Sequence, residues 1–233
     1  MNLIYKFIIK IVMSEEHFEN EYDETLKVIL LGEAFTGKTS LINVFIKEKF
    51  NEDVTNTTAP SYFSKLVTIE DKTILINMWD TAGQEQFRSM NKIFIKKSNI
   101  IIFVYDITRK KTFDELSFWV KYAENIISND NVLYGVVGNK LDLFDKENEV
   151  KESGKEFELV NTEEAKEFAD QMGAEFLETS AKENGPAFTT FVEELVEKYV
   201  KKYMKDKFSH SQKANKINLN ENQIIPQRKK KCC

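Results

Sequence analysis

The chain has 233 residues, of which 42% are hydrophobic and 30% are charged, and this composition favours one globular domain with a tail over a disordered chain. Its net charge of −5 offers no general attraction for nucleic acid, because the basic residues gather at the C-terminus instead. The two cysteines, Cys232 and Cys233, are adjacent and terminal, which fits neither a disulfide framework nor a metal site and agrees with a reducing, cytosolic compartment.

Residues 1–24 are expected to form a disordered N-terminal extension. The segment Met1–Met13 is apolar but contains Lys6 and Lys10, and acidic residues rather than a small-residue cleavage site follow it. A short amphipathic extension, or a true start at Met13, therefore explains this segment better than a signal peptide does. No apolar run in the sequence is long enough to span a bilayer.

The first predicted strand, Leu26–Leu31, leads into a loop with the pattern G-x-x-x-x-G-K-T, which ends at Thr39. Apolar residues at helical spacing then predict a helix over Lys38–Lys47. A strand, a glycine loop and a helix in this order are the context of a phosphate-binding loop. Its backbone N–H groups and the positive end of the helix dipole face phosphate oxygens, while Lys38 reaches the β and γ phosphates and the Thr39 hydroxyl ligates Mg²⁺.

Residues 50–58 are polar and aperiodic, which predicts a loop. Only three residues separate the extended runs Ser64–Ile69 and Thr73–Trp79, and this spacing predicts a hairpin with one antiparallel strand pair. The unbroken apolar run Ile100–Tyr105 is typical of a strand buried on both faces. A helix is expected over Phe113–Ile127, whose Trp119 and Tyr122 fit core packing better than a functional role.

The second half of the chain continues the alternation of strands and helices. Val132–Val137 is the next buried strand, and the charged residues 144–160 form a long surface loop. Asn161 offers a cap for the following helix, Ala174–Glu178 is a short strand, and Pro186 stands where the last helix should start.

This alternation predicts an α/β fold with a doubly wound, mostly parallel six-stranded sheet, one antiparallel edge hairpin and about five helices. The domain is expected to span residues 25–207, and residues 208–233 are expected to form a flexible tail because they lack an apolar period. Ligands of such sheets bind beyond the carboxyl ends of the strands. The candidate site residues follow strands, so they can converge on one crevice.

A polar segment follows the strand that ends at Trp79. Asp80 can hold Mg²⁺ through its water shell. Gly83 lets a backbone N–H approach the γ-phosphate, and Gln84 can orient an attacking water.

A second polar segment, Asn139-Lys140-Leu141-Asp142, follows the strand Val132–Val137. An ionised aspartate only accepts hydrogen bonds, so Asp142 can take two N–H bonds from the edge of guanine, whereas adenine lacks that donor pair. Ser180-Ala181-Lys182 follows the last strand, where a backbone N–H could meet the guanine O6.

The motifs GEAFTGKT, WDTAGQE, GNKLD and ETSAK occur in this order, and the set resembles that of Ras-like small GTPases over about Leu26 to Tyr203. The segments Phe87–Met90 and Phe103–Thr108, with the terminal Cys-Cys, resemble the Rab branch. The resemblance implies a P-loop NTPase fold that binds GTP or GDP together with Mg²⁺. The residues that it assigns to the nucleotide are Ala34, Phe35, Thr36, Gly37, Lys38, Thr39, Ser40, Phe50, Thr57, Gly83, Asn139, Lys140, Asp142, Ser180, Ala181 and Lys182.

The resemblance also assigns roles to particular residues. It implies that Thr39, Thr57 and Asp80 hold the metal, with Thr57 contacting Mg²⁺ and the γ-phosphate only in the GTP state and Thr58 as the alternative. Phe50 falls where the family stacks an aromatic ring on guanine, and burial in the core is the other interpretation of this residue.

A Rab-like molecular switch in vesicle traffic is the function that the resemblance predicts, with slow GTP hydrolysis carried by Lys38 and Gln84. The expected partners of a monomer are exchange factors, GTPase-activating proteins, effectors and proteins of the prenyl-escort and GDI type, and no nucleic acid. Geranylgeranyl groups on Cys232 and Cys233 would attach the chain reversibly to the cytosolic face of endomembranes.

Three functions other than a Rab-like switch are alternatives. A Ras- or Rho-like signalling GTPase lacks support because the usual C-a-a-X ending is absent. A GTP-binding module with little hydrolysis is suggested by the bulky Phe35, since the loop usually carries small residues there. The guanine motif Asn139–Asp142 argues against a nucleotide kinase.

The sequence also departs from the family pattern in two places. The Rab-type I-G-V-D-F is replaced by Thr58–Tyr62, which leaves the identity of the effector open. The loop at 144–160 is longer than the family usually has.

Overall fold

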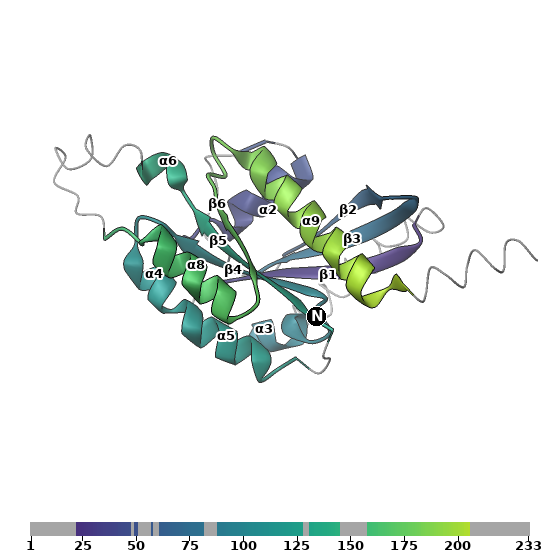
Figure 1. Cartoon of the computed structure of the whole chain (residues 1–233), viewed down its shortest axis with the longest axis horizontal. Coiled ribbons are helices and arrows are strands. Elements are labelled where there is room, and N and C mark those ends of the chain that lie inside the picture. The colour runs from purple at the N-terminus through teal and green to yellow at the C-terminus, as the bar shows by residue number, and fades with distance from the viewer. Residues whose placement is uncertain are drawn as a thin grey trace, which may run out of the picture.

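The computed structural model describes residues 22–47, 49–50, 57, 61–81, 88–127, 131–144 and 158–205. One sheet with the strand order β2-β3-β1-β4-β5-β6 forms the centre of the fold (Figure 1). Only the β2–β3 pair is antiparallel, and the other neighbouring strands of this sheet are parallel, which confirms the predicted doubly wound sheet with an edge hairpin. The strands are β1 (Glu24–Leu31), β2 (Ser61–Ile69), β3 (Lys72–Asp80), β4 (Ile100–Asp106), β5 (Leu133–Asn139) and β6 (Glu175–Glu178).

Helices cover both faces of the sheet, with α2 and α9 on one face and α3, α5 and α8 on the other (Figure 1). The helix expected over Phe113–Ile127 is instead a pair of short helices that meet at Glu115, and α3 and α6 were not predicted from the sequence. The helices are α2 (Lys38–Lys47), α3 (Arg88–Ile95), α4 (Lys110–Asp114), α5 (Leu116–Glu124), α6 (Leu141–Phe144), α8 (Thr162–Gln171) and α9 (Gly185–Tyr203).

The two faces of β1 contribute to two separate cores because successive side chains of a strand point to opposite sides. Leu26, Val28 and Leu30 pack in the core beneath α2 and α9. Ile29 and Leu31 pack in the other core, with residues of α3, α5 and α8. The sequences of the buried strands are therefore continuous apolar runs. The polar residues that follow these strands lie at the carboxyl ends of the sheet.

Two helix starts agree with the sequence signals. The side chain of Asn161 accepts hydrogen bonds from the N–H groups of Glu163 (2.9 Å) and Glu164 (3.2 Å), which confirms the predicted cap of α8. Pro186 stands in the first turn of α9, where its missing N–H leaves no helical bond unmade. No helix in the described part of the chain is long and apolar enough to cross a bilayer.

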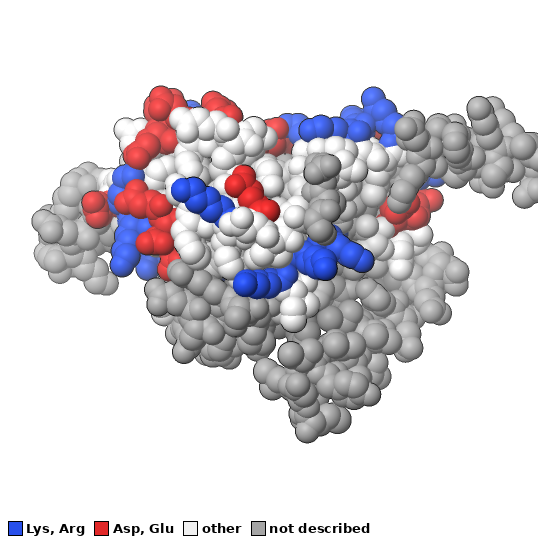
Figure 2. Space-filling view, turned by 90° about the horizontal axis from the view of Figure 1, so that it is seen from below, with Lys and Arg blue, Asp and Glu red and all other residues white. Residues whose placement is uncertain are grey.

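Charged side chains of both signs lie interspersed at the end of the molecule that holds α4 and α8, as Figure 2 shows for one face. At this end Lys110 forms ion pairs with Asp114 (2.6 Å) and Glu164 (2.8 Å). Exposed pairs of this kind contribute little to stability, so the two apolar cores account for the fold.

The contact between α2 and α9 generates a stability prediction. A Cβ at Gly185 would lie 2.2 Å from Cγ1 of Val44, which is too close for a stiff β-branched side chain to yield. Gly185→Ala should therefore lower the free energy of unfolding by about 1–3 kcal/mol in urea titrations at fixed nucleotide concentration.

The matched control is the same change in a Val44→Ala background, where the clashing methyl groups are absent. There the alanine should be neutral or stabilise by about 0.5–1 kcal/mol, because glycine is the poorer helix former. An equal loss in both backgrounds would contradict the proposed clash.

Candidate nucleotide-binding site

The loop between β1 and α2 is pressed against two neighbouring strands at its glycines. Gly32 has φ +144°, and a Cβ there would lie 2.1 Å from the carbonyl oxygen of Val104 in β4. Gly37 has φ +90°, and a Cβ there would lie 2.2 Å from Nδ2 of Asn139. Both positions therefore require glycine, because of backbone conformation and close approach.

Lys38 begins α2 and turns its side chain back over the loop. Its Nζ donates to the carbonyl oxygens of Gly32 (2.9 Å) and Glu33 (2.7 Å). Burial lowers the pKa of Lys38 to about 8, although the carboxylates of Asp80 and Glu33 act in the opposite direction. The ammonium group is thus desolvated next to two carbonyl groups of the loop, where an anionic phosphate would be a strong partner.

Three oxygen-bearing side chains from separate segments converge beside this lysine. The hydroxyl groups of Thr39 and Thr57 lie 2.8 Å apart, and both contact Oδ2 of Asp80, at 2.7 Å and 3.3 Å. Burial raises the pKa of Asp80, whose buried Oδ1 has no hydrogen-bond partner among the described residues.

These residues fit a magnesium ion. Mg²⁺ takes oxygen ligands and binds through one or two carboxylates together with phosphate oxygens and water. The two hydroxyls and the orphaned carboxylate oxygen supply such donors at the mouth of the phosphate-binding loop. A divalent cation would also offset the desolvation that raises the pKa of Asp80.

Asn139, at the end of β5, connects the phosphate-binding loop to the segment after β6. Its Nδ2 donates to the carbonyl oxygen of Thr36 (2.9 Å), and its Oδ1 accepts from the N–H of Ala181 (3.0 Å). Asn139 is almost fully buried, so both bonds are shielded from water. One amide therefore holds two predicted parts of the site in register.

The acidic residue of the third motif is held from the same side. Ser180 donates from Oγ to Oδ1 of Asp142 (2.6 Å), and this Oγ in turn accepts from the N–H of Lys182 (3.1 Å). Asp142 and Ser180 are both buried. The carboxylate is thereby oriented by a serine that belongs to another predicted segment.

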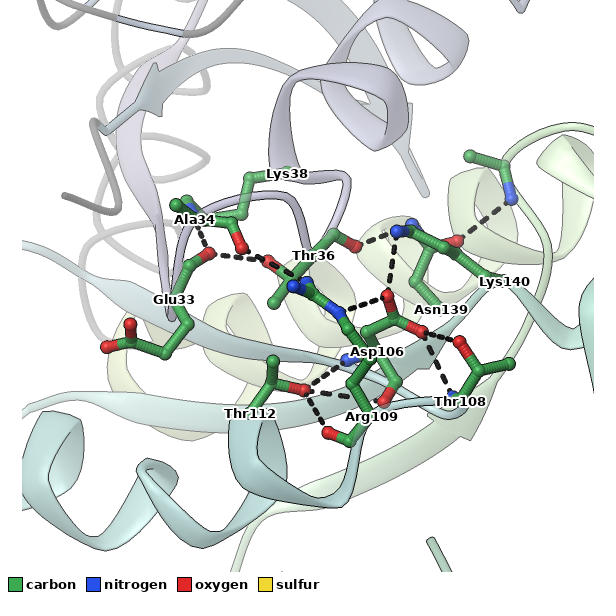
Figure 3. A network of polar contacts seen from close by, with 11 residues as sticks. Glu33, Ala34, Thr36, Lys38, Asp106, Thr108, Arg109, Thr112, Asn139 and Lys140 are labelled. Atoms are coloured by element: carbon green, nitrogen blue, oxygen red, sulfur yellow. Dashed lines mark hydrogen bonds and ion pairs between the residues drawn. The ribbon is translucent and has the colours of Figure 1, made fainter. Parts of the chain in front are cut away.

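Lys140 points toward the end of β4. Its backbone has φ +72°, and its Nζ forms an ion pair with Oδ2 of Asp106 (2.7 Å; Figure 3). Burial alone would raise the pKa of Asp106, but Lys140 and the hydrogen bonds from Thr108 hold it below its usual value. The same Oδ2 accepts from Nε of Arg109 (2.8 Å).

Sequence reasoning missed three contributors to this site. Trp119 is fully buried, as expected, but its Nε1 also donates to Oε1 of Glu33 in the loop (3.0 Å). Asp106 lies in the segment Phe103–Thr108, which resembles the Rab branch, and Arg109 directly follows this segment. No local sequence pattern predicts these contacts, because each joins residues 34 or more positions apart or depends on the bend after β4.

The remaining predicted residues are placed as follows. Phe35 is 62% exposed, and Phe50 is half-buried against the core beneath α2 and α9. Ala34 and Ser40 lie in the loop and at the start of α2. Outside the described residues lie Thr58, Gly83, Gln84, Cys232 and Cys233.

A phosphate-binding loop, a threonine–aspartate cluster and an Asn-Lys-x-Asp segment at one edge of a doubly wound sheet define a nucleotide-binding protein of the phosphate-loop class. A sequence model of the Ras family matches residues 27–205.

Several curated relatives carry Rab names. Ras-related protein Rab11B of Nicotiana tabacum is 30% identical over 92% of this chain and 96% of its own. RABA1c of Arabidopsis thaliana is 32% identical over 77% of each chain, and human Rab-21 is 38% identical over 69% of this chain and 66% of its own. The chain therefore belongs to the Ras family of small GTPases, in its Rab branch, whose members bind guanine nucleotides and Mg²⁺.

Proposed function

We propose that this protein is a GTP-hydrolysing switch that regulates vesicle traffic between intracellular membranes. The observation that carries the proposal is the double hydrogen bond of Asn139, which joins the phosphate-binding loop to the segment at Ala181. A site built for one guanine nucleotide needs this link, because the phosphates and the base are recognised by segments far apart in the sequence.

Guanine recognition rests on Asp142 in this proposal. Ser180 occupies Oδ1 of this carboxylate and fixes its plane. An oriented, ionised carboxylate can accept the two neighbouring N–H groups of guanine, and adenine has no matching donor pair. The N–H of Ala181, already placed by Asn139, lies in the segment that would meet the guanine O6.

Hydrolysis would proceed by attack of water on the γ-phosphate. Lys38 and the loop N–H groups would stabilise the charge that develops, and Gln84 would orient the water. Thr39, Thr57 and Asp80 would hold the magnesium ion, which supplies charge neutralisation at the β and γ phosphates when bound. We assign no arginine among the described residues as a built-in arginine finger, so we expect slow turnover that a partner accelerates.

Switching would follow from the contact of Thr57. This threonine lies 18 residues beyond Thr39 in the chain, and its hydroxyl contacts that of Thr39 (2.8 Å) and Oδ2 of Asp80 (3.3 Å). A γ-phosphate that contacts this hydroxyl would order the segment around Thr57 and release it when the phosphate leaves. Exchange factors, GTPase-activating proteins and effectors would read these two states.

A GTP-binding module with little hydrolysis is the second candidate. Its motivating observation is Phe35, a bulky side chain with φ +64° in the phosphate-binding loop. Its ring is exposed, so a partner that approaches the loop to accelerate hydrolysis would meet it. Single-turnover hydrolysis with and without a partner extract separates the two candidates.

The ends of the chain complete the proposal. We place the switch domain at residues 25–207, between an extension at 1–24 and a tail at 208–233. Two geranylgeranyl groups on Cys232 and Cys233 would give stable membrane attachment where one would not, and the basic segment Arg228–Lys231 would favour an anionic leaflet.

The first test concerns Asp142. Asp142→Asn presents an amide donor to the donor edge of guanine, so GTP affinity should fall about a thousandfold, the equivalent of two charge-assisted hydrogen bonds of roughly 2 kcal/mol each. Xanthosine triphosphate, which carries a carbonyl at that edge, should bind the variant better than GTP does in competition titrations. The matched control is Asp170→Asn, an exposed carboxylate on α8; unchanged GTP affinity in the Asp142 variant would remove this residue from the site.

The second test concerns Gln84. Gln84→Leu keeps the approximate shape but cannot orient water, so single-turnover GTP hydrolysis should slow about tenfold or more while GTP affinity stays near that of the wild type. Gln171→Leu on α8 is the matched control and should hydrolyse GTP normally. Normal hydrolysis in the Gln84 variant would show that another residue positions the water.

The third test concerns the terminal cysteines. In cells, the wild type should sediment with membranes, and changing Cys232 and Cys233 together to serine should leave the protein in the supernatant, because a stable anchor needs two lipid chains. Each single change should give intermediate or misplaced attachment. Equal membrane recovery of the double variant and the wild type would refute the anchor and direct attention to Met1–Met13.

A further inference from the structure

Phe35 adopts a backbone conformation that is costly for its type. Its φ of +64° lies in the left-handed region, which is unfavourable for a residue with a Cβ because the Cβ comes too close to the following carbonyl oxygen. Its ring is 62% exposed, so packing of the side chain does not account for the conformation. Contacts made by the backbone of the loop must therefore hold this residue in place.

One such contact comes from Arg109. Its Nη2 donates to the carbonyl oxygen of Ala34 (3.1 Å), the group that shares a peptide unit with the N–H of Phe35. Arg109 is itself fixed, because its Nε donates to Oδ2 of the buried Asp106 (2.8 Å). The guanidinium thus spans from the end of β4 to the phosphate-binding loop, as Figure 3 shows.

The geometry of a peptide unit makes this contact directional. The described residues contain no cis peptide bond, and in a trans unit the C=O and the N–H point in opposite directions. A hydrogen bond from Arg109 to the C=O of Ala34 therefore turns the N–H of Phe35 away from Arg109. In Figure 3 Lys38, the residue that reaches the phosphates, lies on the opposite side of the loop from Arg109.

We propose that Arg109 is a positioning residue of the phosphate-binding loop, which fixes the Ala34–Phe35 peptide so that the Phe35 N–H faces the phosphates beyond the α position. This inference rests on the proposed nucleotide-binding function. It also explains how the loop carries a phenylalanine at a position with positive φ: the hydrogen bond from Arg109 holds the peptide in the orientation that a glycine would adopt without strain.

Asp106, which holds Arg109, also contacts the segment that begins at Asn139. Oδ2 of Asp106 accepts from Arg109 and from Lys140, while its Oδ1 accepts from the N–H (3.0 Å) and the hydroxyl (2.7 Å) of Thr108. Asp106 is 1% exposed, so its position is set by these bonds and not by solvent. The segment that would bind the base and the loop that would bind the phosphates thus share one carboxylate.

The test measures binding of GDP and of GMP to the full chain. Arg109→Ala should raise the dissociation constant for GDP about tenfold, which corresponds to about 1.4 kcal/mol, and should change that for GMP by less than about twofold. The ratio of the two constants is internal to each protein, so a general loss of folded protein does not alter it. Lys111→Ala is the matched control, because it removes an exposed charge two residues away.

Two further variants separate geometry from charge. Arg109→Lys keeps the charge but not the fork of donors that reaches Asp106 and Ala34 together, so it should retain most of the loss. Phe35→Gly removes the strain, so Arg109→Ala should cost at most about threefold in that background.

Equal weakening of GDP and GMP by Arg109→Ala, full recovery with lysine, or the same loss in the Phe35→Gly background would each overturn the positioning role. Failure of the wild type to bind GDP at all would instead refute the proposed function.

Discussion

The side-chain amide of Asn139 is the interaction on which the rest of the site depends. It donates to the carbonyl oxygen of Thr36 and accepts from the N–H of Ala181, and it is buried between the two segments. Because Nδ2 occupies the space of a Cβ at Gly37, the asparagine and the glycine constrain each other. A larger residue at either position would separate the phosphate-binding loop from the segment after β6.

A second constraint is the burial of carboxylates at the ends of β3 and β4. Asp106 is paired with Lys140 and bonded to Thr108, and its pKa is held low. Asp80 has hydroxyl partners on one oxygen only, and burial raises its pKa. A buried charge without sufficient partners is costly, so Asp80 is suited to a ligand that brings positive charge, whereas Asp106 is a finished structural element.

Some of the side chains around the phosphate-binding loop support it, and others would touch a ligand. Trp119 and Arg109 approach the loop through Glu33 and Ala34, and both are fixed by neighbouring elements. Lys38 instead contacts the carbonyl oxygens of the loop from α2, and Thr39 contacts Thr57 and Asp80. The loop is thus supported at one peptide group, through Ala34, and at one side chain, that of Glu33.

The sequence by itself determined the order of the six strands, the phosphate-binding loop and the cap at Asn161, because these depend on apolar periodicity and on spacings of a few residues. It also predicted that Asp80, Asn139 and Ser180 would meet at one sheet edge, since each follows a strand. It did not predict α3, which has few apolar residues on its first turn and follows a segment without a period.

Only the tertiary structure decided which side chains hold the loop. Arg109 and Ala34 are 75 residues apart, and Trp119 and Glu33 are 86 apart. Local sequence patterns report on neighbours within a helix turn or a strand, whereas these contacts arise from the parallel placement of β1 beside β4. The division of the helix expected over Phe113–Ile127 was likewise set by packing of its first part against the bend after β4, where Thr112 bonds back to Asp106.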